Sequence, residues 1–335
     1  QRRWVNLSRP SVFVSREIPQ SGLDLLRAHC DVTVWPHDRA PTRDELIAQC
    51  QNKDALVCLL TEKVDAAVLA AAPTLKIVAN IAVGFDNLDV AAGTAAGVVM
   101  SNTPGVLDDT TADLAFALLM TTARRLVEGD RIVRSRQWGG WGIMQLLGHD
   151  IHHARLGIVG FGRIGRGVAR RARGFEMTVS YHDAVRAPAD VERELGVSYV
   201  PLDRLLRESD FISLHVPLMP QTHHLIDATA LRAMKRSAIV INTSRGPVVD
   251  EAALVEALRD GVIAGAGLDV YEHEPALADG LAQLSNVVVL PHIGSASIAT
   301  RSKMAEIAAQ NVIAFFQGRT PPTALNPDAL SARRA

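Results

Sequence analysis

The chain has 335 residues, 35 of them basic and 36 acidic, and a formal net charge of −1. This balance, without a block of like charge, argues against a nucleic-acid partner. The longest apolar stretches, such as the one around residues 114–120, are too short to cross a bilayer, so we expect no membrane partner. Hydrophobic residues make up 48% of the chain, which suffices for the cores of two domains.

The cysteines and the first residues indicate the compartment. Cys30, Cys50 and Cys58 are odd in number and lack the spacing of metal ligands, so we interpret them as reduced thiols of a cytoplasmic protein. No apolar run typical of a signal peptide follows the first residues. Residues 1–8 show no hydrophobic period, and we interpret them as a tail outside the fold.

In the first third of the chain, short apolar runs alternate with segments of helical period. Strands are predicted at residues 12–14, 32–35, 55–59, 76–79 and 98–101. Helices are predicted among them at residues 43–50 and 64–72. This alternation is typical of βα units around a parallel sheet, so we expect an open, doubly wound α/β domain.

A second series of βα units follows a long amphipathic pattern. That pattern, over residues 110–133, predicts one helix that joins two domains. Further strands are predicted at residues 156–159, 178–182, 211–214, 238–242, 264–268 and 287–290. Their number matches a six-stranded dinucleotide-binding fold. A last helix, predicted at residues 298–316, could return to the first domain and make that domain discontinuous.

The segment Gly160-Phe161-Gly162-Arg163-Ile164-Gly165 lies between a predicted strand and a helix. Gly160 permits a tight turn, Gly162 lets the backbone approach a pyrophosphate, and Gly165 allows the helix to pack closely on the strand. Asp183 ends the next strand, where a carboxylate can accept hydrogen bonds from ribose hydroxyls. Together these features predict a dinucleotide-binding loop.

Three chemically active side chains follow three later strands. Arg245, Glu274 and His292 each come after an apolar run, so we expect them at one edge of one parallel sheet. An arginine there can bind an anion. A histidine can donate the proton that a ketone oxygen needs as a hydride arrives, and a carboxylate beside it favours the charged imidazolium. The pattern predicts hydride transfer to a carbonyl group.

With this spacing and the glycine motif, the chain resembles the D-isomer-specific 2-hydroxyacid dehydrogenase family over residues 11–326. Within that family it is most similar to glyoxylate and hydroxypyruvate reductases. The segments that carry this closer resemblance are Ala82-Val83-Gly84-Phe85-Asp86-Asn87-Leu88-Asp89, Trp138-Gly139-Gly140-Trp141 and Pro291-His292-Ile293-Gly294-Ser295-Ala296.

The resemblance implies two doubly wound parallel-sheet α/β domains. A Rossmann NAD-binding domain would span residues 108–296, and a discontinuous, flavodoxin-like substrate domain would combine residues 9–107 and 297–328, with the active site between the two. It further implies reduction of a small 2-oxo acid, glyoxylate or hydroxypyruvate, to the D-2-hydroxy acid with hydride from NADH.

The resemblance also implies roles for individual residues. Arg245 would bind the substrate carboxylate and carbonyl oxygen, His292 would donate the proton, and Glu274 would orient and charge His292. The implied substrate-binding residues are Val83, Gly84, Arg245 and Trp141. The implied cofactor-binding residues are Thr111, Gly160, Gly162, Arg163, Ile164, Gly165, Asp183, Pro217, Thr243, Asp269, His292 and Gly294.

Charges near the adenosine ribose bear on cofactor choice. Asp183 would repel the 2′-phosphate of NADP(H), whereas Arg186 and Arg163 would partly attract it. We therefore expect NAD(H) to be preferred over NADP(H). Trp138 and Trp141 suit an interface, although a cluster against their own domain fits almost as well, and we expect a homodimer.

No metal is expected. Residues 152–153 and 223–224 are two pairs of adjacent histidines, and adjacent side chains point apart in regular structure. Hydride transfer needs no metal when an arginine and an imidazolium polarise the carbonyl.

Three other functions are alternatives, and single residues argue against the first two. Phosphite dehydrogenases share the fold and the three candidate residues but carry a lysine where this chain has Val83. Formate dehydrogenases replace the glutamate that is present here as Glu274. Transcriptional corepressors use the same fold as an NAD-sensing interaction module, and fold alone does not distinguish them.

Overall fold

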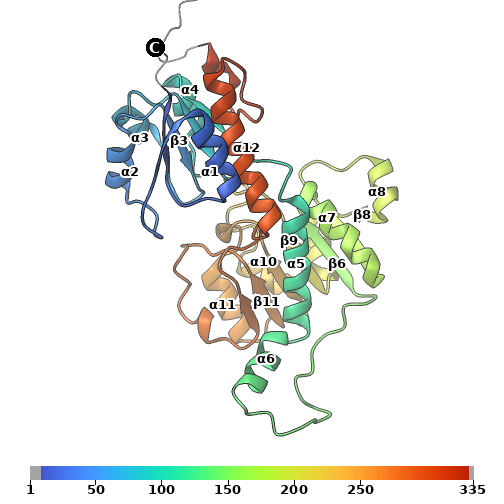
Figure 1. Ribbon diagram of the computed structural model, residues 1–335. Helices are drawn as coiled ribbons and strands as arrows, with labels where there is room; N and C mark the ends of the chain where they lie inside the picture. Colours follow the sequence, from blue (N-terminus) through green and yellow to red (C-terminus); the bar gives the residue numbers. More distant parts are fainter. Residues whose placement is uncertain (1–8, 332–335) are drawn as a thin grey trace, which may run out of the picture. The chain divides into compact units, whose positions relative to one another are not determined.

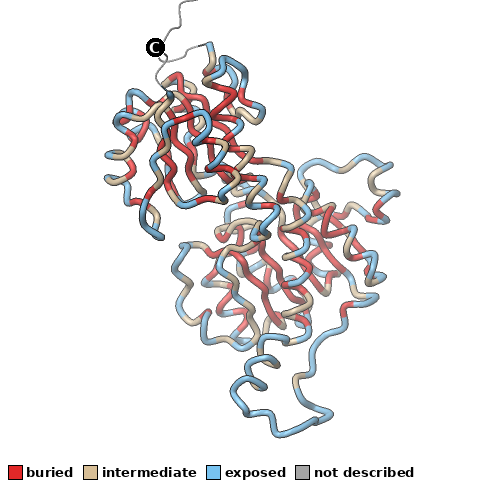
Figure 2. The backbone as a smooth tube through the Cα atoms, viewed as in Figure 1, coloured by how far each residue is buried: buried red, intermediate tan, exposed pale blue. Residues whose placement is uncertain are grey.

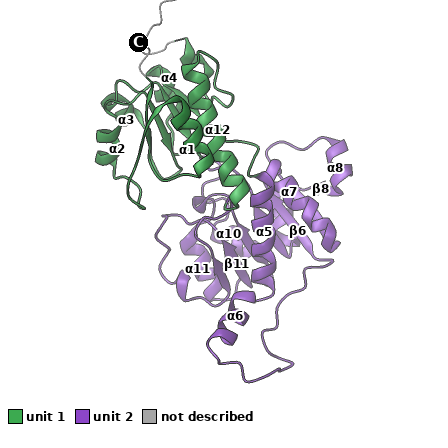
Figure 3. Cartoon of the chain, viewed as in Figure 1, with its two compact units in different colours: residues 1–107, 296–335 green, residues 108–295 purple. Residues whose placement is uncertain are grey.

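The computed structural model describes residues 9–331, so the predicted tail at residues 1–8 lies outside the described part. The chain forms two compact units (Figure 3). Within the described residues, unit 1 comprises residues 9–107 and 296–331, and unit 2 comprises residues 108–295.

Unit 1 is a parallel sheet covered by helices (Figure 1). Its strands are β1 (Ser11–Val14), β2 (Asp31–Val34), β3 (Ala55–Cys58), β4 (Ile77–Asn80) and β5 (Val99–Ser101). Its helices are α1 (Gln20–His29), α2 (Arg43–Cys50), α3 (Ala66–Ala71), α4 (Val90–Ala95), α12 (Ile298–Phe316) and the short η4 (Pro327–Leu330). The strand order β2-β1-β3-β4-β5 is that of flavodoxin-like sheets. Helix α12 packs on α1, β3 and β4.

Unit 2 is a larger parallel sheet. Its strands are β6 (Arg155–Val159), β7 (Thr178–His182), β8 (Val197–Tyr199), β9 (Phe211–Leu214), β10 (Ile239–Asn242), β11 (Gly265–Leu268) and β12 (Val287–Val289). Its helices are α5 (Asp108–Ala123), α6 (Leu126–Arg134), α7 (Arg163–Ala172), α8 (Ala189–Leu195), α9 (Leu202–Glu208), α10 (Ala228–Ala233) and α11 (Glu251–Arg259), with short η1 (Arg173–Phe175), η2 (Gly246–Val248) and η3 (Leu281–Gln283). The strand order is β12-β11-β10-β9-β6-β7-β8.

The buried strands explain why the sheets form where they do. β3, β4, β9 and β10 are buried along their whole length and mainly apolar, as central strands of a sheet covered on both faces must be (Figure 2). The prediction of two parallel-sheet α/β domains is confirmed.

Two details of the prediction are wrong. Unit 2 has seven strands instead of six, because the edge strand β8 has only three residues, one of them exposed, and gives almost no apolar signal. The long helix predicted over residues 110–133 is two helices. Arg125 breaks it with a left-handed φ of 54°, and its guanidinium binds Glu128 through two hydrogen bonds of 2.6 and 3.0 Å.

The topology of unit 2 fixes where a ligand can bind. After β6 the chain adds β7 on one side of that strand, whereas β9 lies on the other side. In open α/β sheets, such a reversal leaves a crevice at the carboxyl ends of the two neighbouring strands. Among residues 9–331, no helix has both the length and the apolar character needed to cross a membrane.

Candidate active site

Arg245, Glu274 and His292, which we call the strand-end triad, follow β10, β11 and β12 in unit 2. These strands are parallel neighbours, so all three residues leave the same edge of the sheet. Nδ1 of His292 lies 2.8 Å from Oε2 of Glu274, and both side chains are about three-quarters buried. With Nδ1 bonded to the carboxylate, Nε2 is the ring nitrogen that remains for a substrate.

The surroundings of Glu274 keep its side chain ionised. Burial raises the pKa of Glu274, but the hydrogen bond with His292, the backbone N–H of Tyr271 and the charge of Arg245 outweigh burial. The N–H of Tyr271 donates to Oε1 of Glu274 at 3.1 Å. The net effect is a pKa below the ordinary value, so a carboxylate faces His292 at neutral pH.

A buried asparagine shapes the turn that carries Arg245. Oδ1 of Asn242 accepts hydrogen bonds from the N–H of Ser244 at 3.0 Å and from its hydroxyl at 2.8 Å, while Nδ2 donates to the carbonyl of Arg245 at 3.0 Å. The turn also packs on the segment before Glu274, because a Cβ on Gly246 would lie 1.8 Å from the carbonyl oxygen of Tyr271. Sequence reasoning missed Asn242, although an asparagine ending an apolar strand is a signal for such a turn.

A buried aspartate holds the turn that carries His292. Asp269 is fully buried, and its two oxygens accept the N–H groups of Ile293 at 2.7 Å and Gly294 at 2.8 Å. Burial raises the pKa of Asp269, and these bonds offset the rise only in part. His292 itself has a left-handed φ of 52°, which is uncommon for a residue with a side chain and marks functional sites. Asp269 thus fixes the backbone on which His292 stands.

The glycine loop joins β6 to α7. Gly160 has a φ of 93°, and a Cβ there would lie 2.6 Å from the backbone of His215, so a glycine is required. A Cβ on Gly165 would lie 2.2 Å from the carbonyl of Gly160. Gly162 is different, because a Cβ there would meet nothing within 4 Å. Its open space at the N-terminus of α7 fits the close approach of a pyrophosphate.

Asp183 lies directly after β7, beside this loop. Oδ2 of Asp183 accepts the N–H of Phe161 at 2.6 Å, so the carboxylate is fixed against the glycine loop. Arg186 is held elsewhere: two hydrogen bonds of 2.9 Å tie its guanidinium to Glu192. Arg186 also lies over the ring of Tyr199. The acidic group is therefore fixed beside the loop, while the nearby basic group is already paired.

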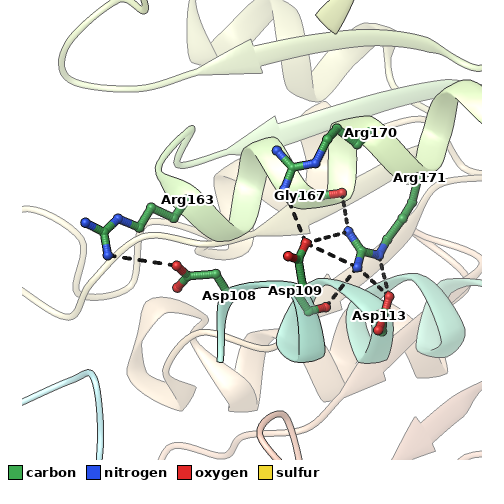
Figure 4. A network of polar contacts seen from close by, with 7 residues as sticks. All are labelled: Asp108, Asp109, Asp113, Arg163, Gly167, Arg170 and Arg171. Atoms are coloured by element: carbon green, nitrogen blue, oxygen red, sulfur yellow. Dashed lines mark hydrogen bonds and ion pairs between the residues drawn. The ribbon is translucent and has the colours of Figure 1, made fainter. Parts of the chain in front are cut away.

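An ion-pair network joins α7 to α5, as Figure 4 shows. Arg171 binds Asp109 and Asp113, and Arg170 binds Asp109 at 3.2 Å. At the start of α7, Arg163 lies 3.9 Å from Asp108 and remains largely exposed. The network fixes the helix whose N-terminus follows the glycine loop.

The other predicted cofactor residues are dispersed over unit 2. Thr111 is buried on α5, close to Gly294, where a Cβ would lie 3.4 Å from its methyl group. Ile164 is partly buried against the core, and Pro217 is exposed after β9. Thr243 follows β10, and within residues 9–331 its buried hydroxyl has no hydrogen-bond partner. That hydroxyl is a group that a ligand could satisfy.

The predicted substrate turn belongs to unit 1 and follows β4. The carbonyl of Val83 accepts a hydrogen bond from Asn102 at 2.8 Å, and the carbonyl of Gly84 accepts one from Asn80 at 3.1 Å. Because a peptide is planar and trans, the N–H of Gly84 points away from Asn102. The turn is thus rigid and can present an N–H donor.

Trp141 lies in the long segment after α6. Its side chain is 80% exposed, so it does not form an aromatic cluster against its own unit. Figure 2 shows that the whole segment between α6 and β6 is largely exposed.

The expectation that the two side chains of each histidine pair point apart is wrong. The rings of His223 and His224 stack with centroids 4.1 Å apart, and those of His152 and His153 meet edge to face at 5.2 Å. The second histidine of each pair has a left-handed φ, 51° in His224 and 61° in His153. That conformation turns neighbouring side chains to one side, which neither regular helix nor strand does.

Comparison with known proteins identifies the family. The model of the NAD-binding domain of D-isomer specific 2-hydroxyacid dehydrogenases matches residues 116–294. A glyoxylate reductase of Korarchaeum cryptofilum is 53% identical over 327 residues, covering 97% of this chain and 98% of the relative. The chain belongs to the D-isomer specific 2-hydroxyacid dehydrogenase family.

Other relatives support this family assignment. A glyoxylate reductase of Thermococcus onnurineus is 49% identical, with 97% and 98% of the two chains covered. A crystal structure of an NADPH-dependent glyoxylate/hydroxypyruvate reductase of Sinorhizobium meliloti superposes with a TM-score of 0.86 at 33% identity, covering 96% of this chain and 98% of that one. The resemblance inferred from the sequence is confirmed, and unit 2 carries a domain for a nicotinamide dinucleotide.

Proposed function

We propose that the chain reduces a small 2-oxo acid, glyoxylate or hydroxypyruvate, to the D-2-hydroxy acid with NADH. The observation that carries this proposal is the bond of 2.8 Å between Glu274 and His292, at the sheet edge that also carries Arg245. A reduced nicotinamide bound in unit 2 would supply the hydride. The named relatives that reduce glyoxylate support the choice of substrate.

Each member of the strand-end triad has a distinct task. Arg245 binds the substrate carboxylate and carbonyl oxygen through the planar fork of its guanidinium. Nε2 of His292 gives its proton to the carbonyl oxygen, so that the carbon gains the hydride and the oxygen becomes a hydroxyl. Glu274 holds the imidazolium charge before the transfer. The N–H of Gly84, with Val83 beside it, donates to the substrate carboxylate.

The experiment that tests this function is a spectrophotometric one. NADH oxidation, followed at 340 nm, is expected with glyoxylate and hydroxypyruvate, and kcat/KM over a panel of 2-oxo acids ranks the substrates. Absence of turnover with every 2-oxo acid would favour an NAD-sensing interaction module. Reduction of NAD⁺ by phosphite instead would favour a phosphite dehydrogenase.

The glycine loop gives a first prediction. Gly162→Ala is expected to weaken NADH binding about tenfold or more, because the added methyl group occupies the open space into which the pyrophosphate approaches. Folding stability should change by no more than about 1 kcal/mol, as expected for an exchange at a helix N-cap. Fluorescence titration with NADH and a thermal melt measure the two effects.

Gly165→Ala is the matched control for that variant. Its methyl group would lie 2.2 Å from the carbonyl of Gly160, so this variant should lose stability as well as binding. If Gly162→Ala bound NADH as tightly as the unmodified protein, the loop would not hold the pyrophosphate.

A second prediction concerns cofactor preference. We expect kcat/KM for NADH to exceed that for NADPH about ten- to a hundredfold, or about 1.4 to 2.7 kcal/mol. Asp183 repels a 2′-phosphate, and Glu192 keeps Arg186 from reaching one. Asp183→Ser should narrow the preference, and adding Glu192→Gln should narrow it further or reverse it.

Glu192→Gln alone is the control, because it releases Arg186 while Asp183 still repels the phosphate. Direct Kd values for NADH and NADPH, measured beside kcat/KM, separate binding from turnover. A preference of the unmodified protein for NADPH, such as the Sinorhizobium meliloti reductase has by name, would remove Asp183 from this role.

A third prediction concerns assembly as a homodimer. Helix α6 buries none of its residues, and exposed apolar side chains continue into the following segment. They are Leu126, Val127, Val133, Trp138, Trp141, Ile143, Met144 and Leu147. A patch of this extent is typical of an interface. Light scattering should give twice the mass of one chain, and Trp141→Ser together with Ile143→Ser should shift the mass towards one chain.

Ile298→Ser is the control, since Ile298 is 91% exposed but lies on α12 in unit 1. It should leave the mass unchanged, and a single-chain mass for the unmodified protein would refute the dimer.

Cys30, Cys50 and Cys58 are free and buried, which fits a reducing compartment, and we propose the cytoplasm.

A further inference from the structure

His223, His224 and Glu272 form a compact group outside the strand-end triad. The histidines lie between β9 and α10, and Glu272 follows β11. One ligand atom from each residue lies within 4.8 Å of the other two, and within residues 9–331 no other group of three or more His, Cys, Asp or Glu side chains has this arrangement. Nε2 of His224 lies 2.7 Å from Oε1 of Glu272.

The backbone holds His224 in an uncommon conformation. His224 has a φ of 51°, and its N–H donates to the carbonyl of Pro247 at 2.8 Å. The N–H of His223 donates to the carbonyl of Met219 at 3.0 Å. The result is that the two rings stack on one side of the chain, 4.1 Å apart, beside the carboxylate. A side chain at positive φ costs free energy, so the conformation needs a reason.

Two hydrogen bonds with Glu251 hold Glu272 in place. Its backbone N–H donates to Oε2 of Glu251 at 2.7 Å, and its own Oε2 accepts the N–H of Glu251 at 3.3 Å. The side chains of Glu272 and His224 remain 18% and 33% exposed, and His223 is exposed. The group is therefore fixed on its inner side and open to solvent on the outer one, where an ion can enter.

We propose that His223, His224 and Glu272 bind a divalent transition-metal ion, with Zn²⁺ as the best fit. Two imidazole nitrogens and one carboxylate oxygen are ligands that Zn²⁺ accepts at about 2.0–2.2 Å, with water as the fourth ligand. On binding, the hydrogen bond between Nε2 of His224 and Glu272 is replaced by bonds from both groups to the ion, and the proton shared by that pair leaves Nε2. Mg²⁺ and Ca²⁺ select oxygen ligands and fit this group less well. His223 is exposed, so an ion from solvent can reach its ring.

This site is separate from the proposed reaction. It uses no member of the strand-end triad, and hydride transfer with Arg245 and His292 in place needs no metal. Metal binding can therefore be tested without substrate or cofactor, and its failure would leave the proposed reductase activity untouched.

The other histidine pair supplies an internal control. His152 and His153 are also adjacent, and Nδ1 of His153 lies 3.2 Å from Glu176. Their rings meet edge to face instead of stacking, and the side chains of His153 and Glu176 are largely exposed. The two pairs have the same residue types but different geometry. Non-specific binding of Zn²⁺ to surface histidines would therefore occur at both pairs.

The test is a calorimetric titration of chelator-treated protein with ZnCl₂. We expect one ion per chain, and His223→Gln should weaken this binding at least about tenfold, or about 1.4 kcal/mol. Glu272→Gln should act in the same direction, whereas His152→Gln should have no effect. The absorption spectrum with Co²⁺ provides a second readout, because a site with bound nitrogen ligands gives bands that the hexaaqua ion lacks.

Three results would overturn the proposal. They are no binding of Zn²⁺ by the unmodified protein, binding that His223→Gln leaves unchanged, or binding that His152→Gln weakens as much as His223→Gln does. His223 is exposed, so its replacement should leave the fold intact, and a thermal melt verifies this.

Discussion

His292→Asn is expected to lower kcat for 2-oxo acid reduction on the order of 10²-fold or more, because it removes the proton donor. Asparagine keeps a polar group that can bond to Glu274, so the turn held by Asp269 should persist. NADH binding should persist, since the glycine loop and Asp183 are untouched. Stopped-flow kinetics and a fluorescence titration measure the two quantities.

Glu274→Gln serves as the companion variant. It keeps the shape of the side chain but removes the carboxylate, whose pKa lies below the ordinary value and whose charge therefore faces His292 throughout the assay range. Reduction needs the protonated imidazole, so activity falls as pH rises. Without the carboxylate, this fall should begin at lower pH. Near-normal turnover of His292→Asn, or an unchanged pH profile of Glu274→Gln, would remove the pair from the mechanism.

The strands and the candidate site were predictable because both depend on local sequence. Apolar runs predicted all strands of residues 9–331 except β8, since strands of a parallel sheet are buried on both faces. Arg245, Glu274 and His292 could be placed together because parallel neighbours expose their carboxyl ends at one edge.

The hydrogen-bond partners of the supporting residues could not be predicted in this way. Asn242 and Asp269 act through the backbone N–H groups that they meet, and those partners depend on how loops pack. The pairing of Arg186 with Glu192 joins a loop to a helix six residues later, and nothing in the sequence excludes other partners. The left-handed φ of Arg125 ends a helix that was predicted to continue, and the left-handed φ of His224 brings together two rings that were expected to point apart. Neither could be predicted, because positive φ in a non-glycine residue leaves no sequence signal.

Arg245→Gln is expected to lower kcat/KM on the order of 10²- to 10⁴-fold. The guanidinium can give two charge-assisted hydrogen bonds to the substrate carboxylate and carbonyl oxygen, each worth about 1.5–3 kcal/mol. Glutamine offers only the N–H donors of one uncharged amide. Arg245 also lowers the pKa of Glu274 through its charge, so the variant should weaken the strand-end triad as well as substrate binding. Both KM and kcat should therefore change, while the Kd of NADH stays the same.

Arg245→Lys separates charge from geometry. Lysine keeps the positive charge but lacks the planar fork, so its kcat/KM should lie between those of the unmodified protein and Arg245→Gln. The carbonyl of Arg245, which Asn242 binds, is retained in both variants, so a thermal melt should show little change. If Arg245→Lys matched the unmodified protein, the fork would be unnecessary; if Arg245→Gln did, Arg245 would not bind the substrate at all.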